Sequence, residues 1–142
     1  MSTLEQTVAR LADDGVLDAA EIASRLNPAD DPVYNARFIT NEMDHWYKRK
    51  LTGRERRALV WRSASTGDER WDALLQGLVA RFCDVAGLEV PYWATLAHAD
   101  PVWSPYGEAT RDDGWFLRMV FSTPAELLRR GVVFGAESLE RV

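Results

Sequence analysis

Hydrophobic positions recur at helical spacing along most of this chain. The widest stripe lies in residues 71–83, follows a capping Asp68, and stops at Gly87, where a left-handed glycine closes a helix without strain. Narrower stripes in residues 4–11 and 33–46 repeat at steps of three and four. These periods predict amphipathic α-helices.

Capping residues precede the predicted helices. Ser2 and Thr52 each stand three residues before a glutamate, which is the spacing of a capping box. Asp18 and Asp31 supply carboxylates for two further starts, the second followed by a proline that fits the first helical turn. Thr123, with Pro124 behind it, predicts a side-chain cap for one more helix.

The remaining segments organise the chain. Residues 63–67 (SASTG) are the best linker candidate, between an N-terminal helical region at 1–62 and a C-terminal helical region at 68–142. Residues 90–112 combine prolines, glycines and aromatics without a sustained period, so we expect ordered loop with short helical turns. Residues 113–121 suit helix or strand, and we favour helix because no second strong strand exists to pair with them. The prediction is an all-α fold, one compact multi-helix domain with a loop-rich aromatic segment near residues 90–112.

Length and composition narrow the class of protein. The 142 residues suit one domain, and 46% hydrophobic with 27% charged residues is ordinary for a globular chain. The single cysteine, Cys83, excludes an internal disulfide and a cysteine cluster for zinc, and its place on an apolar stripe predicts a buried, inert thiol. We find neither a signal peptide nor an apolar run long enough to span a bilayer, and therefore expect a cytoplasmic protein with no membrane partner.

The net charge of −5 is unevenly distributed along the sequence. Residues 1–47 carry −6 and residues 63–142 carry −5, whereas residues 48–62 carry +6. The candidate contact residues in this basic band are Lys48, Arg49, Lys50, Arg54, Arg56 and Arg57. The band has three interpretations: a solvated face that offsets the protein's own acidic segments, attraction to an acidic protein partner, or contact with a phosphate backbone. If the band contacts a nucleic acid, Trp46, Tyr47 and Trp61 are near enough in the sequence for bases to stack on them.

The six tryptophans form two groups. Trp46, Trp61 and Trp71 lie on predicted helices, where we expect them in the core. A second aromatic group consists of Trp93, Trp103, Tyr106 and Trp115 in the least regular part of the chain. We favour core packing beneath irregular backbone for this group, and the alternative is an exposed aromatic patch that contacts a partner.

No motif indicates a catalytic, metal or cofactor site. Residues 18–26 and 32–47 resemble a helix-turn-helix only superficially, because their connector is long and the second helix carries acidic residues that phosphates would repel. His45 and His98 lack the further ligands that zinc needs. We therefore expect a protein that is not an enzyme and has no cofactor.

The C-terminal part of the chain resembles a known group of proteins. The resemblance lies in Thr66-Gly-Asp68, Trp71 to Leu75, Gly87-Leu88, Val90-Pro-Tyr-Trp93, Trp103, Thr123-Pro124, Leu127 to Phe134 and Leu139. It is to small uncharacterised actinobacterial antitoxin-like proteins, found with helix-turn-helix segments or beside nucleotidyltransferase-type toxins. It implies a non-enzymatic module that binds and masks a protein partner, such as a toxin encoded nearby; a nucleic-acid-binding regulator that uses residues 48–62 is the alternative.

Overall fold

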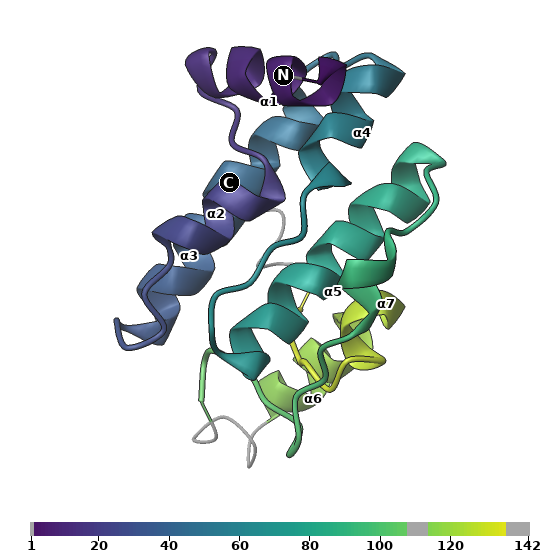
Figure 1. Ribbon diagram of the computed structural model, residues 1–142. Coiled ribbons are helices and arrows are strands. Elements are labelled where there is room, and N and C mark those ends of the chain that lie inside the picture. The colour runs from purple at the N-terminus through teal and green to yellow at the C-terminus, as the bar shows by residue number, and fades with distance from the viewer. Residues whose placement is uncertain (1, 108–113, 136–142) are drawn as a thin grey trace.

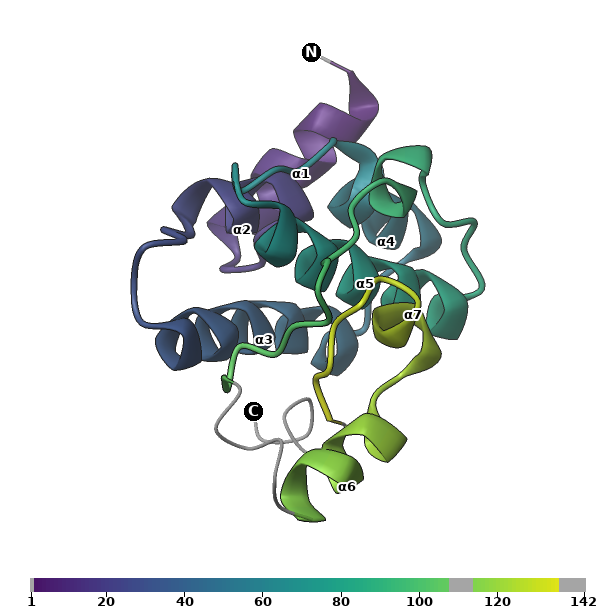
Figure 2. The ribbon, with the colours of Figure 1, turned by 90° about the horizontal axis from the view of Figure 1, so that it is seen from below.

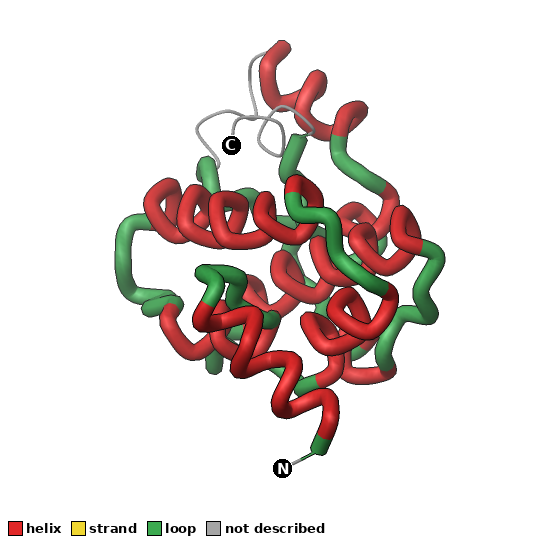
Figure 3. Tube along the Cα trace, turned by 90° about the horizontal axis from the view of Figure 1, so that it is seen from above, coloured by secondary structure: helices red, strands yellow, loops and turns green. Residues whose placement is uncertain are grey.

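The computed structural model describes residues 2–107 and 114–135, with the side chains of 114–117 left out of the description. Its helices are α1 (Thr3–Asp13), α2 (Ala19–Arg25), α3 (Pro32–Lys48), α4 (Gly53–Trp61), α5 (Glu69–Ala86), the 3₁₀ turn η1 (Tyr92–Thr95), α6 (Gly114–Ser122) and α7 (Ala125–Leu128). Helices joined by loops make up the described chain, which contains no β-strand, so the all-α prediction is confirmed (Figure 3).

The predicted caps start most of these helices. Ser2 Oγ accepts a hydrogen bond from the Glu5 amide at 3.1 Å, and Asp31 Oδ1 accepts from two amides at the start of α3. Thr52 and Glu55 form the complete capping box of α4. Each cap satisfies amides that the helix itself leaves without partners, which fixes where the helix begins.

The prediction that Thr123 caps α7 is wrong. Its hydroxyl donates to the Met119 carbonyl at 2.5 Å and accepts from the Phe134 amide at 3.0 Å, so it ties the end of α6 to the segment after α7. The α7 helix begins at Ala125 without a side-chain cap. A buried tertiary partner, Phe134, competes for the hydroxyl that sequence spacing assigns to the helix.

The central helix is α5, which Figure 2 shows near the middle of the fold with α3, α4 and α7 around it. Its buried stripe joins one continuous core that runs from Leu11 in α1 to Phe134 near the described C-terminal end. Two buried tryptophans anchor this core: Trp46 meets Phe82 edge to face at 5.0 Å, and Trp71 is 1% exposed. Both predicted regions therefore contribute to the same hydrophobic interior (Figure 1).

The loop after η1, at residues 99–103, is joined by backbone hydrogen bonds to residues 130–133, which follow α7. Trp103 pairs with Val132 in an isolated parallel bridge, with hydrogen bonds of 2.9 Å from the Trp103 amide to Gly131 O and from the Val133 amide to Trp103 O. The Ala99 amide adds a third bond, 2.7 Å, to the Arg130 carbonyl. These bonds satisfy backbone groups of an irregular segment. The helix favoured for residues 113–121 is confirmed as α6, whereas a last helical turn expected at 136–142 lies outside the described residues.

Candidate binding surfaces

Part of the basic band is used inside the protein. Lys48 Nζ lies 2.6 Å from Asp44 Oδ2 one turn earlier on α3. Arg49 donates to the backbone carbonyl of Asp14 at 2.8 Å, which ties the end of α3 to the loop after α1. For these two residues, the interpretation that the band serves the protein's own structure fits.

The rest of the band faces outward. Among the described residues, Lys50, Arg54, Arg56 and Arg57 form no side-chain hydrogen bond or ion pair. Lys50, Arg54 and Arg57 are exposed, and Arg56 is half-buried. Glu55 stands on the α1 side of α4 and reaches Arg10 at 3.3 Å. A hydrogen bond from the Thr52 amide, with Arg10 adding its charge, holds the pKa of Glu55 below its usual value, so this carboxylate stays ionised on its own side of the helix.

Trp61 belongs to this outward surface. The prediction that it is a core residue is wrong, because 41% of it is exposed. Arg54, Arg57 and Trp61 stand at i, i+3 and i+7, which places them on one face of α4. Leu59 and Val60 take the buried positions instead. We call Arg54, Arg57 and Trp61 the α4 outer face.

The other aromatics near the band are less available for stacking. Trp46 is 1% exposed, and its Nε1 donates to the Leu17 carbonyl at 2.9 Å. Tyr47 is 42% exposed but turns its ring edge to Phe82 at 5.4 Å, and burial raises the pKa of its hydroxyl. Of the three aromatics expected to support phosphate contacts, Trp61 is the one on the same helix face as two unpaired arginines.

The second aromatic group packs against the core where it is described. Trp93 Nε1 donates to the Val60 carbonyl at 3.0 Å. The ring centroids of Trp103 and Trp71 are 4.9 Å apart, and the Arg70 guanidinium lies over the Trp103 ring at 5.4 Å. The Tyr106 ring stacks on Phe134 with 5.8 Å between centroids. These contacts favour the core interpretation over an exposed patch; the side chain of Trp115 lies outside the described residues. Tyr92, which is 78% exposed, was not singled out from the sequence.

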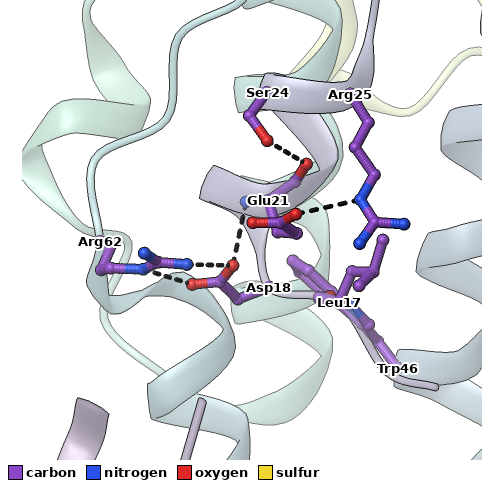
Figure 4. Close-up of polar contacts among 7 residues, drawn as sticks. All are labelled: Leu17, Asp18, Glu21, Ser24, Arg25, Trp46 and Arg62. Atoms are coloured by element: carbon purple, nitrogen blue, oxygen red, sulfur yellow. Dashed lines mark hydrogen bonds and ion pairs between the residues drawn. The ribbon is translucent and has the colours of Figure 1, made fainter. Parts of the chain in front are cut away.

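An ion pair between the buried Asp18 and the exposed Arg62, which the sequence did not indicate, joins α2 to the end of α4. Asp18 caps α2 through the Glu21 amide at 3.0 Å and accepts two further bonds of 2.8 Å from the guanidinium of Arg62. Figure 4 shows this pair beside the Glu21–Arg25 ion pair. The four residues also line a depression of about 400 Å³, together with residues of α1. Hydrogen bonds to Asp18 raise the pKa of Arg62. Because the charges satisfy one another, this arrangement serves to hold the two helices together.

A carboxyl pair connects α5 and α7. The Glu126 carboxyl is hydrogen-bonded to that of Asp84, and this bond together with burial raises the pKa of Glu126. The raised pKa means that Glu126 is protonated more readily than an ordinary glutamate. Beside it, burial raises the pKa of the Cys83 thiol to about 11, as predicted for an inert cysteine. No group of three or more His, Cys, Asp or Glu side chains able to hold a metal occurs within residues 2–107 and 114–135.

None of the helices in the described part of the chain has both the length and the apolar composition that crossing a bilayer requires. No protein-family model, curated protein or solved structure matches this chain. Its function is therefore argued from its own surfaces.

Proposed function

We propose that this protein is a non-enzymatic binding module whose α4 outer face docks on an acidic surface of a partner protein. The proposal is carried by Arg54 and Arg57, which are unpaired within the described residues and stand two turns and one turn before the exposed ring of Trp61. Arginine and tryptophan are the residue types that most often dominate the energy of protein interfaces.

Charge complementarity supports an acidic protein over a nucleic acid. The protein as a whole carries −5, so phosphate-rich polymers are repelled by most of its surface. The unpaired part of the basic band, within the described residues, is confined to α4 and to Lys50 just before it. One exposed aromatic ring, that of Trp61, accompanies it. An acidic patch on a folded partner needs no wider basic surface than this, and complementary charge would accelerate the encounter.

The resemblance of the C-terminal segment to antitoxin-like proteins supports the same proposal and suggests a toxin as the partner. A protein that covers the active site of a toxin needs a rigid binding surface rather than catalytic groups. The capping box at Thr52 and the ion pair of Arg10 with Glu55 fix α4 at its start, and the Asp18–Arg62 pair fixes it at its end.

Affinity purification of the tagged protein from its native host tests the proposal. The protein should recover one acidic partner at stoichiometric amount, and rising salt should release it, because exposed ion pairs are screened. A variant with Arg54→Glu and Arg57→Glu should lose the partner. Arg37→Glu, an equally exposed charge reversal on α3, should retain it and is the matched control.

Two results would contradict the proposal. One is recovery of the protein alone at every salt concentration. The other is loss of the captured material on nuclease treatment, together with salt-dependent binding of the purified protein to RNA or duplex DNA that the double charge reversal abolishes; this would favour the alternative, a nucleic-acid-binding regulator.

A further inference from the structure

A depression of about 480 Å³, whose lining includes none of the three residues of the α4 outer face, lies between residues 63–67, the first turns of α5 and the chain around η1. Its volume is within the range of small-ligand sites. The segment expected to be a linker forms one wall and is firmly held: the carboxylate of Asp72 accepts the Thr66 amide at 2.6 Å, the Thr66 hydroxyl at 2.8 Å and the Ser65 hydroxyl at 3.2 Å. The wall is therefore formed before any ligand arrives.

Gln76 supplies a hydrogen-bond donor at the base of this depression. It is 6% exposed, and its Oε1 accepts the amides of Leu96 at 3.1 Å and Ala97 at 2.8 Å. Those two bonds fix the orientation of the amide. Its Nε2 donates to no acceptor among the described residues. Since no fully enclosed side-chain nitrogen in the described chain lacks a partner, Nε2 must reach open space, and Gln76 lines the depression.

An amide donor that reaches open space without a protein partner is available to water or to a ligand. The group complementary to it is a carbonyl or hydroxyl oxygen. Of the described residues that line the depression, Glu69 and Asp72 carry carboxylates and none is basic. The lining therefore disfavours anions and suits a neutral or positively charged ligand.

The remaining wall is apolar. Only the ring surface of Trp93 is available to a ligand, because its Nε1 already donates a hydrogen bond to the Val60 carbonyl. Leu96 lies next to it and is 60% exposed. An aromatic ring and a leucine accommodate the methylene stem of a long cationic side chain, with Glu69 at the rim for the charge. Glu69 forms no ion pair with another described residue.

We propose that this depression binds a peptide segment at an arginine or lysine residue. The backbone carbonyl of that residue accepts from Gln76 Nε2, its stem lies along Trp93, and its charge pairs with Glu69. The inference does not rest on the proposed function, since it uses a different surface and a ligand of opposite charge.

Titration of the ¹⁵N-labelled protein with blocked amino acids tests the site directly. The probes are N-acetyl-arginine N-methylamide, its leucine analogue and its glutamate analogue. The arginine probe should shift the side-chain amide signal of Gln76 and the indole signal of Trp93, with an affinity about threefold above that of the leucine probe, as one exposed ion pair provides. The glutamate probe should be the weakest.

Two variants separate the contributions. Glu69→Gln should remove the preference for the arginine probe and leave leucine binding unchanged, whereas Glu89→Gln, at another exposed position, should keep the preference. Gln76→Glu retains an acceptor for both backbone amides but removes the donor, and should weaken the leucine probe at least about fivefold. Gln6→Glu, the same change on the exposed side of α1, should have no effect.

The proposal is overturned if none of the probes shifts the Gln76 and Trp93 signals, or if the glutamate probe binds as tightly as the arginine probe. Unchanged leucine binding in Gln76→Glu would also overturn it. If that variant does not fold, Glu69→Gln still decides, because its side chain is exposed and an undiminished arginine preference contradicts the assigned contact.

Discussion

Substituting Gly131 by alanine should destabilise the fold far more than a change of one methyl group suggests. Gly131 has φ +75°, in the left-handed region that disfavours a side chain. A Cβ built there would overlap the carbonyl oxygen of Ala99 and lie 3.2 Å from the His98 ring. The overlapped atom belongs to the backbone, so a side-chain rotation cannot relieve it.

The structure gives the magnitude. The left-handed conformation costs about 1 kcal/mol for alanine. Separating the Ala99 carbonyl from the α7 end strains the three hydrogen bonds that join residues 99–103 to 130–133, and losing two of them costs about 2 kcal/mol. The expected loss in the free energy of unfolding for Gly131→Ala is therefore about 3 kcal/mol.

Urea unfolding followed by far-ultraviolet circular dichroism measures this loss. Gly15→Ala is the matched control, because Gly15 has φ +84° and nothing lies within 4 Å of its added Cβ. It should lose only the conformational part, about 1 kcal/mol. Equal losses in the two variants would refute the reasoning, since the contact with Ala99 would then contribute nothing.

Three further predictions concern polar contacts between distant parts of the fold. Arg62→Ala should lower the free energy of unfolding by about 2 kcal/mol, because Asp18 loses two hydrogen bonds. The loss is smaller than for a fully buried pair because Arg62 is half-exposed. An unchanged urea midpoint would contradict this. Glu126 has a raised pKa, so its pairing with Asp84 stabilises the fold fully below the unfolded value near 4.5 and loses this contribution as pH rises through the folded value. Glu126→Gln should therefore gain stability relative to the unsubstituted protein as pH rises over that interval, and a constant difference at all pH values would oppose the assignment. Trp46→Phe keeps a ring but leaves a buried carbonyl without its 2.9 Å partner, which should cost at least about 1 kcal/mol in urea unfolding, and a neutral effect would show that the bond is dispensable.

The sequence was a good guide to helix starts and a poor one to the faces that helices expose. Thr52 and Asp68 act locally, within three residues of the amides they cap, so spacing alone identified them. Trp61 was misplaced because large aromatic residues usually lie inside, and only the packing of Leu59 and Val60 leaves its ring outside. Thr123 was misplaced because its hydroxyl has a distant partner.

For the two proposed binding surfaces, too, some features follow from local sequence and others only from tertiary contacts. Arg54 and Arg57 were expected from the local run of basic charge, but the sequence could not tell which basic residues are paired. In the structure Lys48 pairs with Asp44, whereas Arg54 and Arg57 have no partner among the described residues. One indication in the sequence that Gln76 is unusual is that it is a polar residue within the widest apolar stripe. Its meaning depends on Leu96 and Ala97, twenty residues away, whose amides orient it.

The sequence by itself determined that the chain is helical and where most helices begin, because periodicity and capping act over a single turn. Only the tertiary structure decided that the Ala99 carbonyl lies against Gly131, that Asp18 pairs with Arg62, and that residues 63–67 line a depression. Those outcomes depend on contacts between residues far apart in the chain, whose partners are chosen by how the whole core packs, and no local pattern records that choice.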